Sequence, residues 1–370
     1  MNKPIRILHI LREMEMGGAQ RLIMNVYQEI DKTKVQFDFL VSAKGAYDEK
    51  IIENGGKIYY IPYLTEVGQF RYKRELKDFF SKHKEYKIIH SHIDQVSGII
   101  LQAAKECDIP IRIAHSHNTK NSNNFIGKIY KLYLQSKINK SATDYFACSK
   151  EAAKWLFKKK AEKAIIINNG IKLDDYKYST EKRKKIRKEL KISDDTLVIG
   201  HIGRFSKQKN HQFLIEIFER YQKENKKSVL VLIGTGELKA KIQDLIKEKK
   251  IERSVILLGT KSDANNYYSA FDIVVFPSKY EGISLTLIEA QASGVPIVAS
   301  QNVDKNTDVS NSIKFIKDYH IDDWVNAIKQ IDKKRQNNIE KIEKSGYNIE
   351  NTANFLMKKY IEFYEEYKNE

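Results

Sequence analysis

The chain has 370 residues, of which 65 are Lys or Arg and 48 are Asp or Glu, so its formal net charge is +17. That length exceeds what one hydrophobic core supports, and two domains are expected. No apolar run approaches the roughly 20 residues of a membrane-spanning helix, and the N-terminus lacks the layout of a signal peptide. The two cysteines, Cys107 and Cys148, are interpreted as reduced core residues of a cytosolic protein.

Short β-branched runs alternate with amphipathic helical patterns along the chain. The predicted strands are 5–10, 35–41, 57–61, 88–90, 111–115, 145–148, 164–167, 197–202, 229–233, 255–258, 273–276 and 296–299. The helical patterns between them include 19–30, 94–107, 208–224, 238–249 and 285–292. This alternation is typical of βαβ units, and the number of strands suits two parallel sheets.

A domain boundary is expected near Asn168-Asn169-Gly170, where a buried type of strand ends and a charged segment follows. We therefore predict an N-terminal domain over 1–172 and a C-terminal domain over 173–349. One long helix with an aromatic face is predicted for the last residues, about 350–370.

The positive charge predicts a polyanionic partner, for which nucleic acid, an anionic membrane surface and nucleotide phosphates are the candidates. A lysine-rich composition without functional meaning is the alternative. Because lysine dominates and no nucleic-acid-binding motif is present, we expect no nucleic acid partner.

The segment 277–300, PSKYEGISLTLIEAQASGVPIVAS, carries two glutamates, Glu281 and Glu289, eight positions apart. A turn with Gly282 joins the first glutamate to an apolar helical run that holds the second. One carboxylate thus stands just before a helix whose first-turn N–H groups are open, and the other lies on that helix. This arrangement suits a ligand with hydroxyl groups at both ends and a phosphate between them.

Two strand-to-helix loops are candidates for binding phosphate. Gly17 and Gly18 follow the first strand and would let backbone N–H groups approach a phosphate, although a plain tight turn is the alternative. In the second half, Arg204 and Lys209 enter a loop where a guanidinium fork and an ammonium would neutralise a diphosphate. Solvated surface cations are the alternative there, and the position at the carboxyl end of a strand favours ligand binding.

Two His-x-His pairs end neighbouring strands, His90 with His92 and His115 with His117. Such pairs also serve as metal ligands, but no cluster of cysteines or carboxylates accompanies them and the sequence has no Asp-x-Asp pair, so we expect no metal. A hydrogen-bonding role at the carboxyl edge of a sheet is the favoured interpretation, and a purely structural role is the alternative.

The segment 118–143 carries five lysines and no acidic residue. The apolar side chains predicted to share one helical face there are Phe125, Ile126, Ile129, Tyr130, Tyr133 and Leu134. A helix of this kind can lie on anionic lipid or can pack on its own domain with its lysine stems along the apolar surface.

Together these motifs resemble glycosyltransferase family 4, whose members are retaining enzymes of the GT-B fold. The resemblance covers most of the chain and is strongest from Gly200 to Ser300, in the Glu–seven residues–Glu element followed by ASGVP. It is also visible in MGGAQ (16–20), NNGI (168–171) and RIAHSHN (112–118). The bacterial exopolysaccharide and capsular polysaccharide branch is the most similar.

The resemblance implies an α/β fold of two Rossmann-like, doubly wound parallel-sheet domains that face a central cleft. The N-terminal domain would bind the acceptor and the C-terminal domain the nucleotide sugar, with the C-terminal helix packing back on the first.

The resemblance also implies a role for each site residue. Glu289 would bind the ribose hydroxyls and Glu281 the hydroxyls of the donor sugar, while Arg204 and Lys209 would hold the diphosphate. His115 matches the active-site histidine of the family, with His117 as the alternative. The further donor-binding residues would be Gly17, Gly18, Gly259, Thr260, Lys261, Ile283, Ser284, Leu285 and Thr286. Ile283-Ser284 stands where many members have Phe-Gly.

The implied reaction is the transfer of a glycosyl group from a nucleoside diphosphate sugar, with a UDP-sugar favoured, and with retention at the anomeric carbon. It would need no metal or other cofactor, because cations and helix amides stabilise the leaving diphosphate. The implied acceptor is a lipid-linked saccharide at the cytoplasmic face of the plasma membrane, where the enzyme would bind peripherally. A transferase with a soluble acceptor and a GT-B-fold sugar-nucleotide epimerase are the alternatives.

Overall fold

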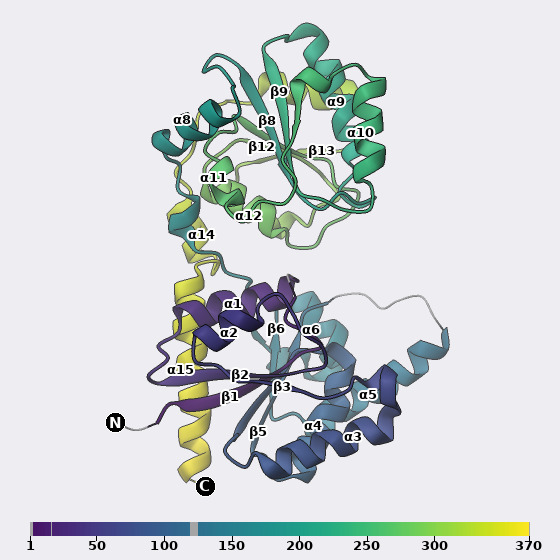
Figure 1. The fold of residues 1–370 in the computed structure, drawn as a ribbon, viewed down its shortest axis with the longest axis vertical. Coiled ribbons are helices and arrows are strands. Elements are labelled where there is room, and N and C mark those ends of the chain that lie inside the picture. Colours follow the sequence, from purple (N-terminus) through teal and green to yellow (C-terminus); the bar gives the residue numbers. More distant parts are fainter. Residues whose placement is uncertain (1–2, 16, 119–124, 370) are drawn as a thin grey trace. The chain divides into compact units, whose positions relative to one another are not determined.

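The computed structural model describes residues 3–15, 17–118 and 125–369, with the backbone alone for 125–129. The chain divides into two units, one formed by Met1–Gly170 with Ile349–Glu370 and the other by Ile171–Asn348. Each unit is built around one parallel sheet (Figure 1). We call them the N-unit and the C-unit.

The N-unit contains a seven-stranded sheet in the order β3-β2-β1-β4-β5-β6-β7. Its strands are β1 (Ile5–Ile10), β2 (Val35–Val41), β3 (Ile58–Tyr60), β4 (Ile88–Ser91), β5 (Ile111–Ser116), β6 (Asp144–Ala147) and β7 (Ile165–Ile166). The order changes direction between β1 and β4. Open α/β sheets bind ligands beyond the carboxyl ends of the strands at such a point, which is where the predicted pairs His90 with His92 and His115 with His117 stand.

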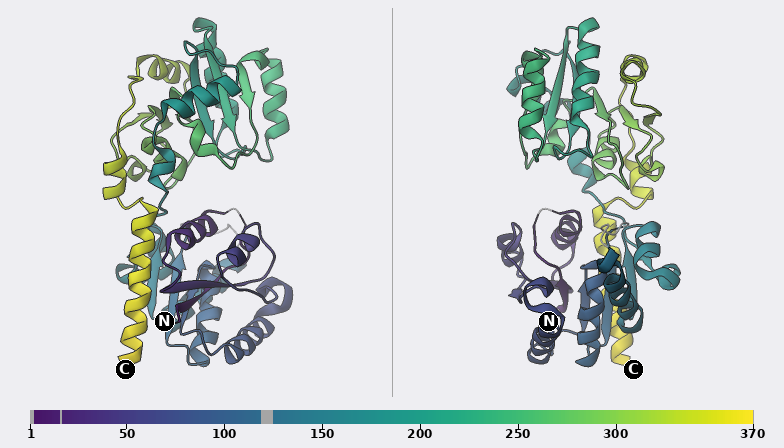
Figure 2. Two further views of the ribbon diagram at one scale, coloured as in Figure 1. Left: turned by 60° about the vertical axis from the view of Figure 1, so that its left-hand side comes forward. Right: turned by 90° about the vertical axis from the view of Figure 1, so that its right-hand side faces the viewer.

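Helices cover both faces of this sheet, and alternate strand residues enter two separate cores. Ile7 and Phe37 point into the core that also contains α1 and α15, whereas Leu8 and Leu40 point into the core with α3 to α6. The C-terminal helix α15, drawn in yellow, lies beside the sheet in both further views (Figure 2). The helices of the N-unit are α1 (Gly18–Glu29), α2 (Asp48–Glu53), α3 (Leu64–Lys82), α4 (Ser97–Glu106), α5 (Phe125–Ser141), α6 (Lys150–Phe157) and α15 (Ile349–Asn369).

The C-unit repeats this plan with a six-stranded parallel sheet in the order β10-β9-β8-β11-β12-β13. Its strands are β8 (Leu197–Ile202), β9 (Ser228–Ile233), β10 (Val255–Leu257), β11 (Ile273–Phe276), β12 (Ile297–Ser300) and β13 (Ile313–Ile316). Its helices are α7 (Leu173–Tyr176), α8 (Thr180–Glu189), α9 (His211–Glu224), α10 (Lys239–Glu248), α11 (Ala264–Tyr267), α12 (Leu285–Ala292), α13 (Ile321–Gln330) and α14 (Ile339–Lys344). The direction of the order changes between β8 and β11, beside the loop that carries Lys209.

Three elements differ from the sequence prediction. The strand β13 was not predicted, because its four residues include a lysine and it forms only by pairing with β12 at the sheet edge. The helix expected over 208–224 begins at His211, since Asn210 has a left-handed backbone that cannot continue the helix. The pattern over 94–107 divides into a 3-10 turn at Asp94–Val96 and α4. The other predicted strands and helices are confirmed, with ends within one residue of those expected.

Two predictions about side-chain environments are confirmed in part. Both cysteines are free as expected, and they are half-buried against the core that contains α3 to α6. In α5, Tyr130 and Tyr133 are exposed while Leu134 is buried, so the helical face that these three residues share is only partly covered. Phe125, Ile126 and Ile129 lie outside the described side chains. Among the described helices, none has an apolar stretch long enough to cross a bilayer.

Candidate active site

The paired-glutamate motif is held in place by backbone bonds before α12. The N–H of Glu281 donates to the carbonyl of Asn302 at 3.1 Å, and the N–H of Asp304 donates to the carbonyl of Glu281 at 3.1 Å. These two bonds form an isolated bridge beside Val303. The position of the Glu281 carboxylate is therefore fixed by tertiary pairing as well as by the turn that follows it.

Glu281 and Lys209 form an ion pair at the carboxyl end of the C-unit sheet. The Nζ of Lys209 lies 2.7 Å from Oε1 of Glu281, and the two side chains are only 16% and 11% exposed. Lys209 Nζ also lies 4.6 Å from the centre of the Phe276 ring at the end of β11. The structure thus brings together one predicted phosphate ligand and one predicted sugar ligand.

Glu289 is buried on α12 and is held by two tyrosines. The hydroxyl groups of Tyr176 and Tyr268 each donate to one of its carboxylate oxygens, both at 3.0 Å. An ionised carboxylate can accept about four hydrogen bonds, so these two leave capacity for a diol. The sequence pattern gave no indication of either tyrosine, because both are distant from Glu289 in the chain.

The N-terminus of α12 offers backbone donors next to these carboxylates. Ser284 is the N-cap residue, and its own N–H donates to Oγ1 of Thr307 at 3.3 Å. Within the described residues, the N–H groups of Ile283 and Leu285 make no hydrogen bond. Thr286 is half-buried, and its carbonyl oxygen lies 3.1 Å from the Tyr268 hydroxyl oxygen. Open N–H groups at a helix N-terminus favour an anion, and one of the three predicted donors, Ser284, is already engaged.

Arg204 stands apart from this group. Its side chain is 75% exposed, and its Nε lies 3.3 Å from Oε2 of Glu237, also at the surface. The structure therefore does not place Arg204 against the carboxylates, and its assignment to the diphosphate remains a prediction.

The loop with the predicted donor-binding residues Gly259, Thr260 and Lys261 is connected to the loop of Arg204 through Gly234. The N–H of Gly234 donates to the carbonyl of Gly259 at 2.8 Å, and an added Cβ on Gly234 would lie 2.1 Å from the carbonyl oxygen of Gly203. Only glycine fits there, at φ +136°. Thr260 is exposed and Lys261 half-buried beyond this contact.

In the N-unit, Gly17 is the N-cap of α1 and Gly18 its first residue. A Cβ on Gly18 would meet no atom within 4 Å, so packing does not require glycine at that position. The phosphate-binding role of this loop remains a prediction.

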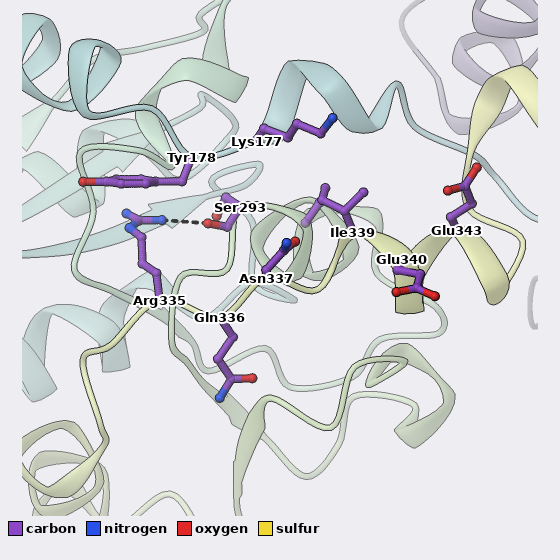
Figure 3. Close-up of a pocket in the computed structure, with 10 residues that line it drawn as sticks. Lys177, Tyr178, Ser293, Arg335, Gln336, Asn337, Ile339, Glu340 and Glu343 are labelled. Carbon is purple, nitrogen blue, oxygen red and sulfur yellow. Dashed lines mark hydrogen bonds between the residues drawn. The ribbon is translucent and has the colours of Figure 1, made fainter.

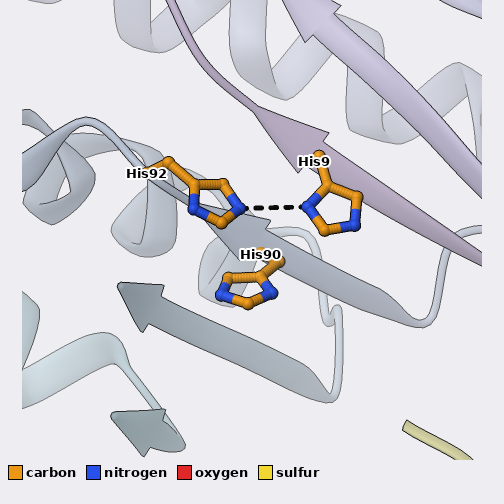
Figure 4. Close-up of side chains that lie close together, drawn as sticks. All are labelled: His9, His90 and His92. Carbon is orange, nitrogen blue, oxygen red and sulfur yellow. Dashed lines mark hydrogen bonds between the residues drawn. The ribbon is translucent and has the colours of Figure 1, made fainter. Parts of the chain in front are cut away.

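The four histidines of the two predicted pairs are joined by a fifth, His9, at the carboxyl ends of β1, β4 and β5. His9 Nδ1 lies 3.0 Å from His92 Nε2, and His92 Nδ1 lies 2.9 Å from His117 Nε2. His90 Nε2 lies 3.1 Å from His115 Nδ1. Figure 4 shows His9 and His92 joined in this way, with His90 alongside. The position of His9 near the end of the first predicted strand could have indicated it as a site residue. Its place beside His90 could not be predicted, because it depends on the pairing of β1 with β4.

Burial keeps these five imidazoles neutral. It lowers the pKa of His9 to about 3 and that of His117 to about 4, and it lowers the pKa of His90, His92 and His115 well below 6.5. His115 is almost fully buried and His117 is half-buried. A cavity of about 10 Å³, enough for about one water molecule, lies between the histidines, α1 and α15.

A larger cavity of about 540 Å³ lies elsewhere in the C-unit, between the end of α12 and α14 (Figure 3). Its central cation, Arg335, donates to the carbonyl groups of Tyr268, Phe271 and Ser293 and lies 4.2 Å from the Tyr178 ring. The guanidinium already donates to these carbonyls, and none of the predicted site residues lines the cavity. We therefore assign Arg335 a structural role.

Two doubly wound parallel-sheet units, one of them with a glutamate before the helix α12 and a second glutamate on it, define the GT-B class of glycosyltransferases. Residues 16–175 match the family described as Glycosyltransferase Family 4, and residues 182–351 match Glycosyl transferases group 1. The chain belongs to glycosyltransferase family 4.

Several relatives and solved structures are similar over nearly the whole chain. EpsF of Bacillus subtilis, named as a glycosyltransferase, is 33% identical over 310 residues, which cover 82% of this chain and 81% of EpsF. The UDP-Gal:alpha-D-GlcNAc-diphosphoundecaprenol alpha-1,3-galactosyltransferase of Escherichia coli is 23% identical over 343 residues, 88% of each chain. HepE of Anabaena in complex with UDP has the same fold, with a TM-score of 0.79 at 17% identity over 96% of this chain and 100% of HepE.

Proposed function

We propose that this glycosyltransferase moves a sugar from a UDP-sugar to a lipid-linked saccharide in the synthesis of a cell-surface polysaccharide, with retention at the anomeric carbon. The observation that carries the proposal is the grouping of Glu281, Lys209 and Glu289 around the N-terminus of α12. The reaction needs hydroxyl acceptors at the two ends of the donor and positive potential between them, and this grouping provides both.

The ion pair gives Lys209 two roles in this scheme. Before the donor binds, the ammonium neutralises Glu281 in a largely enclosed position. When the donor binds, its diphosphate would share the ammonium, and Glu281 would be available to the sugar hydroxyls. Glu289 would keep its tyrosine partners and accept from the ribose hydroxyls with its remaining lone pairs.

Bond cleavage would place negative charge on the leaving UDP and positive charge on the sugar ring. Lys209, Arg204 and the N–H groups of Ile283 and Leu285 would stabilise the first charge, so no step requires a metal. The imidazole of His115, or that of its neighbour His117, would contact the donor sugar from the N-unit. Glu281 and Glu289 would act as hydroxyl acceptors and not as nucleophiles.

The choice of donor and acceptor is supported by what similar proteins bind or act on. HepE was solved with UDP and with UDP-glucose. The Escherichia coli relative takes UDP-Gal as donor and a diphosphoundecaprenol-linked sugar as acceptor. CapH of Staphylococcus aureus is a capsular polysaccharide biosynthesis glycosyltransferase.

A basic and aromatic surface on α5 would hold the enzyme at the membrane. We define this α5 face by Tyr130, Tyr133, Lys137 and Lys140. The two tyrosines are 39% and 48% exposed, and Lys137 Nζ lies 4.6 Å from the centre of the Tyr133 ring. Exposed aromatic side chains beside lysines favour an anionic lipid surface.

The first test of the function measures thermal stability of the full chain with UDP, GDP, ADP and a panel of UDP-sugars. Selective stabilisation by UDP and by one UDP-sugar is expected. That UDP-sugar is then incubated with a polyprenyl-diphosphate-linked saccharide, and the anomeric configuration of the product is read by NMR. An inverted product would contradict the retaining mechanism, epimerised donor would favour the epimerase, and stabilisation by GDP or ADP alone would contradict the choice of UDP.

The membrane component is tested by sedimentation with vesicles that contain anionic lipid. The double variant Lys137→Glu/Lys140→Glu should lose most of its vesicle binding. A matched control reverses two exposed lysines of the C-unit, Lys239→Glu/Lys241→Glu, and should bind as the wild type does. Equal binding of the two variants would contradict a role of the α5 face.

A further inference from the structure

The five buried histidines form two separate hydrogen-bonded chains. One chain runs from His9 through His92 to His117. The other begins at the Tyr360 hydroxyl on α15, which lies 2.7 Å from His90 Nδ1, and continues from His90 Nε2 to His115 Nδ1. Each chain therefore takes one imidazole from the carboxyl end of each strand that it crosses.

Ring geometry separates bonding within a chain from contact between the chains. Two of the three bonded pairs are close to coplanar, with interplanar angles of 19° for His9 and His92 and 16° for His90 and His115, and the third, His92 with His117, is tilted at 32°. Between the chains the rings stack, His90 on His92 at 4.2 Å and His115 on His117 at 4.1 Å. Coplanar rings with nitrogens about 3 Å apart have the geometry of N–H···N hydrogen bonds.

The same stacking argues against a shared metal ion. The nitrogens of His9, His90 and His92 lie within 4.8 Å of one another, as do those of His92, His115 and His117. However, each triplet includes two stacked rings, whose lone pairs lie in nearly parallel planes and do not converge on one point. Both nitrogens of His90 are also already engaged.

Tyr360 fixes the direction of hydrogen-bond donation along the second chain, which runs from Tyr360 through His90 to His115. Its side chain is fully buried, and His90 Nδ1 is the hydrogen-bond partner that the described residues offer its hydroxyl. If the hydroxyl accepted instead, neither its own proton nor the buried Nε2 lone pair of His115 would have a partner among the described residues, whereas donation by Tyr360 leaves only the Nε2–H of His115 without one. Tyr360 therefore donates, His90 Nδ1 accepts, and the proton of the neutral His90 is on Nε2.

The direction set by Tyr360 passes on to His115. His90 Nε2–H donates to His115 Nδ1, so the proton of His115 is on Nε2. That atom is buried and has no hydrogen-bond partner among the described residues. The chain of His9, His92 and His117 ends on both sides at nitrogens without a hydrogen-bond partner in the described part of the protein, which also offers no hydroxyl that fixes its direction.

We propose that Tyr360 is a positioning residue that, through His90, holds His115 as the tautomer protonated on Nε2. The consequence for catalysis rests on the proposed function. If His115 serves the donor sugar, it does so as a hydrogen-bond donor from Nε2 and not as a general base. The C-terminal helix would then contribute to the chemistry of the N-unit as well as to its packing.

The test is two-bond ¹H–¹⁵N NMR correlation of the full chain labelled with ¹⁵N-histidine, with His115→Gln used for assignment. In the wild type, His115 should show a protonated Nε2 and an unprotonated Nδ1. Tyr360→Phe should turn His90 and His115 into mixtures of tautomers while the spectra of His9, His92 and His117 stay unchanged. Tyr364→Phe, one turn further along α15, is the control and should leave all five unchanged.

Each other result would overturn the proposal: a protonated Nδ1 on His115 in the wild type, an unchanged His115 in Tyr360→Phe, or a stoichiometric metal by elemental analysis. These readouts do not depend on activity, so they stand even if no UDP-sugar is turned over. With an active donor, Tyr360→Phe should lower kcat about three- to tenfold and leave the UDP affinity of the C-unit unchanged. An unchanged kcat with altered tautomers would confine the role to structure and contradict the catalytic consequence.

Discussion

Lys209 Nζ lies 2.7 Å from Glu281 Oε1, in a pair whose two side chains are almost enclosed. The pair joins the loop after β8 to the loop before α12, two segments more than seventy positions apart. A donor diphosphate that approaches the lysine must compete with this carboxylate. Binding of the donor and release of Glu281 are therefore linked in the proposed mechanism.

Removing either partner of this pair should destabilise the protein, because the other charge is left largely enclosed. We expect Lys209→Met and Glu281→Gln each to lower the free energy of unfolding by about 1–3 kcal/mol. The double variant should lose less than the sum of the two. Urea denaturation measures all three, and strictly additive losses would contradict the coupling.

The same two variants should separate the nucleotide from the sugar. Lys209→Met should weaken binding of both UDP and the UDP-sugar, since both carry the diphosphate. Glu281→Gln should bind UDP at least as tightly as the wild type, because the diphosphate no longer competes with a carboxylate, and should lose turnover of the UDP-sugar. Calorimetric titration with each ligand is the measurement, and equal loss of UDP affinity in the two variants would contradict the division of roles.

Glu289 should govern affinity for the nucleoside. We expect Glu289→Gln to raise the Kd for UDP about tenfold or more, because hydrogen bonds to a charged acceptor contribute roughly 1.5–3 kcal/mol. Tyr176→Phe removes one tyrosine donor, keeps the carboxylate, and should change the Kd far less. The result that would remove Glu289 from the site is an unchanged Kd for both UDP and uridine.

Arg204 is exposed, so its loss should affect binding without affecting folding. Arg204→Ala should leave the free energy of unfolding within about 0.5 kcal/mol of the wild type. It should weaken UDP binding, increasingly so at low salt, and leave uridine binding unchanged because uridine has no phosphate. Arg253→Ala, at another exposed arginine of the C-unit, serves as the control. Loss of uridine affinity would indicate a different role.

Acid should destabilise the fold through its buried histidines. Burial lowers the pKa of His9 to about 3 and that of His201 to about 4, whereas the unfolded chain binds these protons below about 6.5. The stability that they contribute is complete above pH 6.5 and is lost as the pH falls toward the folded values, by up to about 1.4 kcal/mol per pH unit for each histidine.

Urea denaturation at pH 7.5 and pH 5.5 checks this prediction. His9→Phe should reduce the difference between the free energies of unfolding at the two pH values. The phenyl ring still contacts Phe37 and Phe39 but cannot be protonated. The exposed His320 provides the control variant, His320→Asn, which should keep the full difference. A stability that does not change between the two pH values would contradict the assignment of neutral buried imidazoles.

The sequence by itself determined the alternation of strands and helices, because period-2 and period-3.6 patterns are local properties of the chain. It also located Glu281 and Glu289, since a turn and about one helical turn set their separation. It could not reveal β13, whose four residues become a strand only by pairing with β12. The exposure of Tyr130 and Tyr133 could not be predicted from the sequence either, because the pattern of α5 does not show which side of the helix packs on α4.

Tertiary structure alone decided the partners of the site residues. Tyr176 and Tyr268 reach Glu289 from segments 113 and 21 positions away, and Lys209 reaches Glu281 across the sheet. Strand order placed His9 beside His90, and the return of α15 brought Tyr360 to the same histidine across 270 positions. Local sequence carries the type and spacing of a side chain, whereas its partners depend on chain closure over long separations, which no local pattern encodes.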